Sequence, residues 1–165
     1  MSEKGLRHVN ESVAIRRARL EDADAIVAVL RRSITELCVD DHRHDAAMLG
    51  AWLQNKTAAN ARVWIEAIGN FMVVAQGEGG GGLCGVASLS AMGTILLCYV
   101  LPEVQFKGVG RALLKSVEAE ARLRGLLGIS LESTLSARAF YSRHGYRPMQ
   151  NGAPDSPLLY KVLMS

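Results

Sequence analysis

The 165-residue sequence lacks the features of a secreted, membrane-spanning or strongly charged protein. Its three cysteines, Cys38, Cys84 and Cys98, are odd in number and far apart, so we expect no disulfide framework and predict a reducing cytoplasm. Residues 1–12 lack the apolar core of a signal peptide, and no apolar run is long enough to cross a bilayer. The net charge of +3 suits an anionic cofactor but shows no clustered basicity. We therefore expect a cytoplasmic protein that binds neither nucleic acid nor a membrane.

The composition that is present is typical of a folded globular protein. Hydrophobic residues make up 49% of the chain and charged residues 21%, which argues against disorder. The length suits one hydrophobic core, and no internal repeat or linker divides the chain. We predict a flexible segment at residues 1–12, followed by one domain over residues 13–165.

The hydrophobic periodicity alternates between strands and helices. Strands are predicted at residues 13–17, 71–75, 83–89, 94–100, 127–131, 146–150 and 158–163. Helices are predicted at residues 21–37, 48–53, 61–68, 108–124 and 136–144, with a polar interruption at residues 40–44 and a glycine-rich hairpin connection at residues 77–82. This order predicts an α/β (α+β) fold, in which a mixed sheet carries helices on both faces.

Three side chains are given specific places in these helices. Asp22 is predicted in the first turn of the first helix, where the helix dipole favours negative charge. Glu118 is predicted on the outward face of the helix at residues 108–124, with Arg122 as its i,i+4 partner. Ser136 is predicted to cap the helix that contains Tyr141.

The most informative segment is Gln105-Phe106-Lys107-Gly108-Val109-Gly110-Arg111-Ala112, between a strand and a long amphipathic helix. Glycines allow close approach of a ligand to the backbone, and the amides at the helix N-terminus form a site for a pyrophosphate-like anion. This segment does not fit a kinase-type P-loop, which needs Gly-Lys-Ser/Thr, because Arg111-Ala112 follows the last glycine. It does not fit a dinucleotide fingerprint either, because Leu113 stands where a third glycine or alanine is needed.

Two motifs resemble those of the GNAT superfamily of acyltransferases. The first is Gln105-x-x-Gly108-x-Gly110 after the strand at residues 94–100, and the second is the segment Ala137-Arg138-Ala139-Phe140-Tyr141-Ser142-Arg143-His144-Gly145-Tyr146. The resemblance covers residues 13–163. It implies a GNAT fold with a sheet of about six to seven strands, in which the acyl-CoA strand splays from its neighbour.

The resemblance also implies an N-acetyltransferase that uses acetyl-CoA and releases CoA. The pantetheine arm would pair with the backbone at Tyr99 and Val100, and Tyr141 would protonate the departing thiolate. The residues that the resemblance assigns to the cofactor are Tyr99, Val100, Gln105, Lys107, Gly108, Val109, Gly110, Arg111, Ala137 and Tyr141.

The base that deprotonates the amine is less clearly indicated. Some family members place a glutamate at the start of the acyl-CoA strand, where this sequence has Thr94. Glu132, at the end of the next strand, is the substitute candidate, although a solvated carboxylate at a strand end explains it equally well. Cys98 lies in an apolar strand without a histidine nearby in sequence, so we do not expect it to be a nucleophile.

The first helix and the following loop supply candidates for contact with the acceptor. They are Arg32, Ser33, Glu36 and Asp41, and a solvated helix face is the alternative interpretation. No metal site is predicted, because the spacing of Cys38, His42, His44 and Asp45 matches no standard zinc pattern. The acceptor would be a small-molecule or peptide amine, and a homodimer is compatible with the fold. A non-catalytic acyl-CoA-binding protein and, more remotely, a nucleoside-triphosphate enzyme are the alternative functions.

Overall fold

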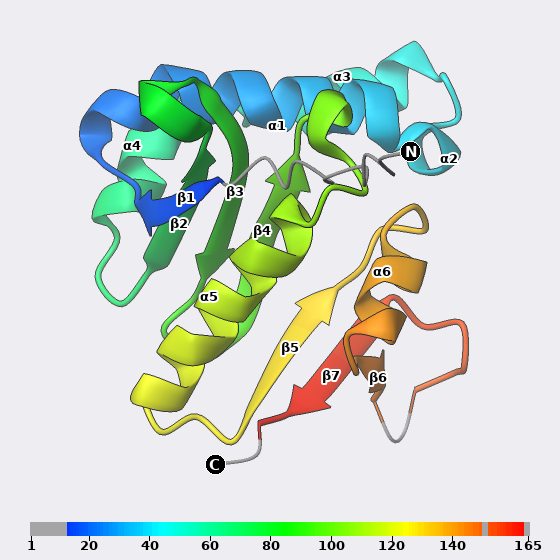
Figure 1. Ribbon diagram of the computed structural model, residues 1–165. Helices are drawn as coiled ribbons and strands as arrows, with labels where there is room; N and C mark the ends of the chain where they lie inside the picture. Colours follow the sequence, from blue (N-terminus) through cyan, green and yellow to red (C-terminus); the bar gives the residue numbers. More distant parts are fainter. Residues whose placement is uncertain (1–12, 150–151, 164–165) are drawn as a thin grey trace, which may run out of the picture.

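The computed structural model describes residues 13–149 and 152–163 (Figure 1). The segment at residues 1–12 that was predicted to be flexible lies outside these residues. Seven strands form one sheet in the order β1-β2-β3-β4-β5-β7-β6. They are β1 (Ala14–Arg17), β2 (Phe71–Gln76), β3 (Leu83–Leu89), β4 (Thr94–Val100), β5 (Gly128–Glu132), β6 (Arg147–Pro148) and β7 (Leu158–Val162). β4 and β5 are parallel and every other neighbouring pair is antiparallel, so the predicted mixed sheet is confirmed.

The helices are α1 (Ala23–Leu37), α2 (Val39–His42), α3 (Ala46–Leu53), α4 (Ala58–Glu66), α5 (Val109–Leu123) and α6 (Arg138–Arg143). The stretch predicted as a polar interruption is wrong in part, because α2 occupies its first half. Arg43 follows α2 in the left-handed region with φ 54°, and this turn ends the helix. The side chain of Asp45 then accepts from the first amides of α3.

The central strands are buried on both faces. In β2, Val73 and Ala75 pack into the core beneath α5, whereas Met72 and Val74 pack into a second cluster beneath α1. This alternation explains why β2 is a continuous apolar run, since a strand covered by helices on both faces has no solvent side. The helices therefore cover both faces of this part of the sheet, as predicted.

β4 and β5 separate soon after they meet. Their pairing is limited to Thr94 with Ser130 and Ile95 with Leu131. On the other side of β4 the register with β3 shifts, so that Leu96 is an extra residue between paired neighbours. Such a bulge bends a strand and increases its twist. It coincides with the point of separation, and the predicted splay after the acyl-CoA strand is confirmed.

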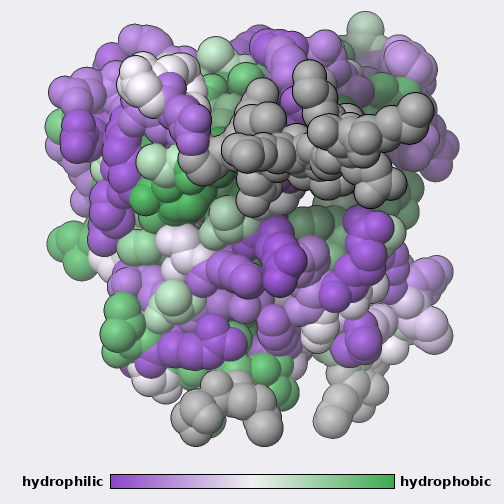
Figure 2. All heavy atoms as spheres, viewed as in Figure 1, coloured by the Kyte–Doolittle hydropathy of each residue, from purple (hydrophilic) through white to green (hydrophobic). Residues whose placement is uncertain are grey.

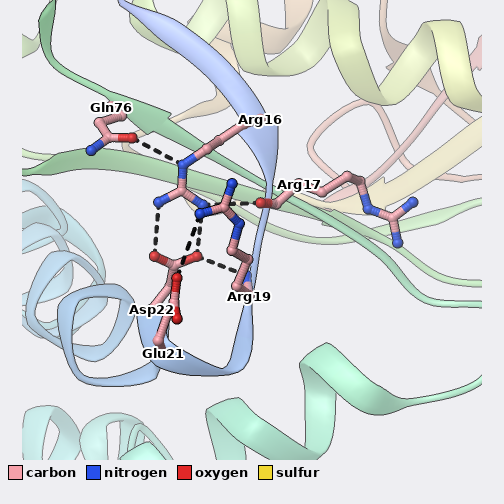
Figure 3. A network of polar contacts seen from close by, with 6 residues as sticks. All are labelled: Arg16, Arg17, Arg19, Glu21, Asp22 and Gln76. Atoms are coloured by element: carbon pink, nitrogen blue, oxygen red, sulfur yellow. Dashed lines mark hydrogen bonds and ion pairs between the residues drawn. The ribbon is translucent and has the colours of Figure 1, made fainter. Parts of the chain in front are cut away.

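A polar network joins β1 to the start of α1 (Figure 3). Both terminal nitrogens of Arg16 donate to the Asp22 carboxylate at 2.8 Å, and the Arg19 backbone N–H donates to the same carboxylate at 2.7 Å. The hydrogen bonds from Arg16 are the main reason that the pKa of Asp22 is lowered. Asp22 belongs to a 3₁₀ turn, Leu20–Asp22, so its predicted place in the first turn of α1 is wrong.

The long helix α5 carries one residue on the side opposite to the prediction. Glu118 was expected to face outward but is only 6% exposed. Its carboxylate accepts from the Tyr146 hydroxyl and from Lys161 Nζ, each at 2.9 Å, while Arg122 lies 4.0 Å away. The expected pairing with Arg122 is therefore one part of a larger set of polar contacts around the buried Glu118 carboxylate, and this set connects α5 to β7.

The viewed face of the molecule is predominantly hydrophilic, with hydrophobic residues in smaller separate groups (Figure 2). Among the described residues, no helix is long and apolar enough to cross a membrane.

Candidate functional site

The N-terminus of α5 is shaped by two left-handed residues. Phe106 has φ 65° and Gly108, which directly precedes the helix, has φ 89°. A glycine adopts this conformation without the steric penalty of a side chain. The first intrahelical bond is donated by the Ala112 N–H to the Gly108 carbonyl, so the amides before Ala112 have no partner within the helix. These amides form a positively polarised site at the predicted loop.

A cavity of about 500 Å³ begins at this loop. It passes Gly108, Gly110 and Arg111, continues along β4, and reaches β5, α1 and α6. The absence of a side chain at Gly110 keeps this part of the cavity open. A Cβ at this position would fill the space next to the Phe140 ring, at a distance of 3.4 Å. The splay between β4 and β5 is what allows residues from both faces of the sheet to line one cavity.

The edge of β4 that faces β5 provides backbone groups along this cavity. Residues 96–100 lie beyond the last β4–β5 pair and line the cavity. Peptide groups at a strand edge without a neighbouring strand can pair with an extended ligand that contains amides. The predicted backbone positions, Tyr99 and Val100, are part of this edge.

Tyr141 lies in α6 and is 6% exposed. Its ring contacts Phe140 and Tyr146 in edge-to-face arrangements, with centroid distances of 5.2 Å and 5.6 Å. Its phenol donates a hydrogen bond to the sulfur of Cys98 on β4. Burial is the main reason that the pKa of Tyr141 is raised well above its usual value, so the phenol keeps its proton.

Cys98 is a thiol and not a thiolate at neutral pH. Burial raises its pKa to about 11, which the hydrogen bond from Tyr141 only partly opposes. Since the thiolate is the nucleophilic form of cysteine, this environment disfavours a covalent role and agrees with the interpretation drawn from the sequence.

Glu132, the candidate base, and Thr94, which stands where some family members have a glutamate, lie in different places. Glu132 is exposed at the end of β5 and lines the same cavity as Tyr141. Thr94 lies outside the lining, and its hydroxyl is 3.3 Å from that of Ser130 on β5. Of the two, Glu132 is the residue that the fold brings to the cavity.

The four residues predicted to touch an acceptor are separated by the fold. Ser33 is 3% exposed and lines the cavity. Arg32 forms exposed ion pairs with Glu36 at 3.1 Å and with Glu103 at 2.6 Å. Asp41 binds the loop between β5 and α6, where its carboxylate accepts from the Leu135 and Ser136 amides at 2.7 Å and 3.3 Å.

The start of α6 differs from the prediction for Ser136. The Ser136 hydroxyl donates to Asp41 at 2.6 Å, and the Thr134 hydroxyl accepts from the Ala137 N–H at 3.1 Å. α6 begins at Arg138 without a side-chain cap, so the predicted capping role of Ser136 is wrong. The Ser136 hydroxyl is instead directed at Asp41, which is far away in sequence.

The predicted cofactor residues lie mostly along the cavity. Eight of them line it: Tyr99, Val100, Gln105, Gly108, Gly110, Arg111, Ala137 and Tyr141. Val109 is the buried first residue of α5 and lies outside the lining, and Lys107 lies in the exposed loop, also outside the lining. Sequence reasoning missed Phe140, Arg143 and His144, which also line the cavity. All three belong to the second motif. The presence of Arg143 and His144 in that motif was the available signal that basic side chains line this part of the cavity.

A family model described as an acetyltransferase (GNAT) domain matches residues 38–154. The chain belongs to the GNAT family. The match contains the loop at residues 105–112, the β4–β5 splay and Tyr141, and it supports the assignment of this GNAT protein as an N-acetyltransferase. No curated protein sequence matches the chain.

Solved structures share the fold over almost the whole chain. A GCN5-related N-acetyltransferase from Rhodopseudomonas palustris is 25% identical with a TM-score of 0.79, covering 92% of this chain and 96% of that one. The PaiA N-acetyltransferase from Thermoplasma acidophilum in complex with coenzyme A is 19% identical with a TM-score of 0.77, covering 92% and 99%. The putative acetyltransferase YncA from Salmonella typhimurium with acetyl-CoA is 24% identical with a TM-score of 0.66, covering 93% and 95%. The last two are similar in fold alone.

Proposed function

We propose that this GNAT protein transfers the acetyl group of acetyl-CoA to a primary amine by direct attack. One observation carries the proposal: a single cavity joins the amides at the start of α5, the free edge of β4 and the buried phenol of Tyr141. These three features match, in order, a pyrophosphate, a chain containing amides and a thioester.

The residues along the cavity fit acetyl-CoA. The first-turn amides of α5 would hold the pyrophosphate, and Arg111, Arg143 and His144 supply the basic side chains of the lining. The edge of β4 at Tyr99 and Val100 would pair with the pantetheine amides. When it is bound, acetyl-CoA supplies the reactive thioester, and β4 and α6 would hold it between them.

In the reaction, the amine nitrogen forms a bond to the thioester carbonyl carbon and the carbon–sulfur bond breaks. Glu132 would take the proton that the amine loses, and Tyr141 would give a proton to the departing sulfur. A phenol with a raised pKa can do this because burial also raises the basicity of a thiolate. Cys98, in the same cavity, shows this effect with a pKa of about 11. The products are an amide and the CoA thiol.

Calorimetric titration of the purified protein tests the proposal, with acetyl-CoA as the ligand and ATP and NAD as controls. We expect selective binding of acetyl-CoA, followed by thiol release when amines are added. A folded sample that does not bind acetyl-CoA would overturn the proposal. Binding without thiol release for any amine class would instead support the non-catalytic acyl-CoA-binding alternative.

A further inference from the structure

Within residues 13–149 and 152–163, the wall of the cavity on the α1 side carries no charged residue. It is formed by Ser33, Leu37 and Cys38 of α1 and the turn that follows it, and by Leu97 and Tyr99 of β4. The basic residues of the lining come from α5, from α6 and from the residue that follows α6, and both helices pack on the opposite face of the sheet. A molecule that reaches the thioester from the α1 side therefore meets a different surface from the one that faces the phosphates.

The polar groups in this wall are neutral. Burial raises the pKa of Cys38 to about 12, so its thiol stays protonated. Burial also raises the pKa of Tyr99, and its phenol accepts a hydrogen bond from the Trp52 indole. Ser33 is 3% exposed. The wall offers apolar contacts and neutral groups, which favour an apolar body over a charged one.

The acidic residues around the cavity are few and mostly engaged. Among the residues that the structure describes, Glu132 is the one carboxylate in the lining. Nearby, Glu36 and Glu103 are paired with Arg32, and Asp41 is bound to residues 135–136. One carboxylate suits one ammonium group, whereas a polyamine gains affinity from several.

Contacts between distant parts of the chain lie at one side of the cavity rim. Asp41 of α2 receives three hydrogen bonds from Leu135 and Ser136, and Ser136 itself lines the cavity. In Figure 1, α2 lies next to the loop between β5 and α6. We call these contacts the Asp41 clasp. An extended polypeptide that entered here would compete with the clasp, whereas a small molecule would not.

We infer that the acceptor is a small monoamine with an uncharged, largely apolar body. The inference rests on the proposed acetyl transfer and names the substrate class of the same site. It selects against two other classes of amine, polyamines and lysine side chains in polypeptides. The neutral wall contacts the body of the amine, Glu132 faces its nitrogen, and the Asp41 clasp limits its size.

The test compares CoA release from saturating acetyl-CoA with four amines at one pH. They are n-hexylamine, its polar analogue of equal length 2-(2-aminoethoxy)ethanol, spermidine, and a short unstructured peptide with one lysine. We expect kcat/KM for n-hexylamine to exceed each of the others by about tenfold or more. A higher kcat/KM for spermidine, the peptide or the polar analogue would overturn the inference while leaving the acetyl transfer intact. Failure to bind acetyl-CoA would instead reject the proposed function.

Replacement of the clasp residue provides a second readout. In Asp41→Ala we expect the ratio of kcat/KM for the peptide to that for n-hexylamine to rise about fivefold or more, because the rim loses its three hydrogen bonds. Asp40→Ala is the matched control, since Asp40 is the neighbouring exposed acid. An unchanged ratio in a folded Asp41→Ala protein would contradict the role of the clasp. If that variant does not fold, the wild-type amine comparison still decides the inference.

Discussion

The hydroxyl of Tyr141 lies where the proposed reaction needs a proton donor. Its ring is held between Phe140 and Tyr146, and its phenol points to the sulfur of Cys98. A sulfur atom already accepts the hydrogen bond of this phenol in the free protein. A thioester sulfur that reaches the same region would therefore meet a neutral donor whose orientation is fixed by packing.

Replacement of this hydroxyl should separate catalysis from binding. In Tyr141→Phe we expect kcat to fall by about 100-fold while the Kd for acetyl-CoA changes little, because only the proton donor is removed. Steady-state kinetics with calorimetry check this. Tyr160→Phe is the control, since Tyr160 lies on β7 and is 37% exposed. An unchanged kcat would show that water or another group protonates the sulfur.

The backbone at Gly108 should be needed for affinity. Its φ of 89° suits glycine, and a Cβ there would meet no atom within 4 Å, so the space in front of the loop is open for a ligand. In Gly108→Val we expect the Kd for acetyl-CoA to rise about 10- to 100-fold, as bonds to a charged group are lost. Calorimetry checks this. Gly80→Val is the matched control: Gly80 has φ 81° and equally open space, in the β2–β3 hairpin. Equal affinities of the two variants would contradict the placement of the phosphate site.

At the scale of elements, the Arg16–Asp22 pair is the connection that fixes β1 against the start of α1 (Figure 3). The pKa of Asp22 is lowered in the folded protein, so the carboxylate stabilises the fold above its unfolded pKa of about 3.9. That contribution is lost as the pH falls through the lower, folded pKa.

We therefore expect Asp22→Asn to lower the free energy of unfolding by about 1–3 kcal/mol at pH 7 and by less at pH 3. Urea denaturation of both proteins at the two pH values measures the difference. Asp24→Asn, at an exposed position in the first turn of α1, should have the smaller effect at pH 7. A loss that is equal at pH 3 and pH 7 would mean that the ionised carboxylate is not what stabilises the junction.

In α5, the hydrophobic periodicity predicts the burial of some residues correctly and of another incorrectly. Leu114, Val117 and Ala121 recur at helical spacing and are buried as predicted. Glu118 is spaced like a surface residue, yet Tyr146 and Lys161 from other elements surround its carboxylate. Periodicity describes one helix by itself. The partners of a buried charge come from tertiary packing, which no single-helix pattern contains.

For the whole molecule, the sequence predicted the succession of strands and helices, the mixed sheet and the splay, and it named cofactor positions of which most line the cavity, because each of these depends on local motifs in a fixed order. The Asp41 clasp could not be predicted in this way, since its partners are 94 and 95 residues away. The ion pairs of Arg32 with Glu36 and Glu103 likewise depend on how α1 meets the segment after β4. The surroundings of the candidate acceptor residues therefore depend on tertiary contacts that local motifs do not contain.

The two parts of the sheet meet at only two residue pairs between β4 and β5. A ligand that binds between the separated strands should therefore protect the backbone amides on both of its sides from hydrogen exchange. With acetyl-CoA at about 100 times its Kd, some backbone amides can exchange only after the ligand has dissociated. We expect hydrogen exchange at these amides to slow by about 100-fold. Hydrogen exchange with mass spectrometry should show this for residues 96–100 and 108–112, whereas the hairpin at residues 77–82 serves as an internal control. ATP should give no protection at residues 96–100. If acetyl-CoA protects residues 108–112 alone, the phosphate site is present but the acyl chain does not lie along β4.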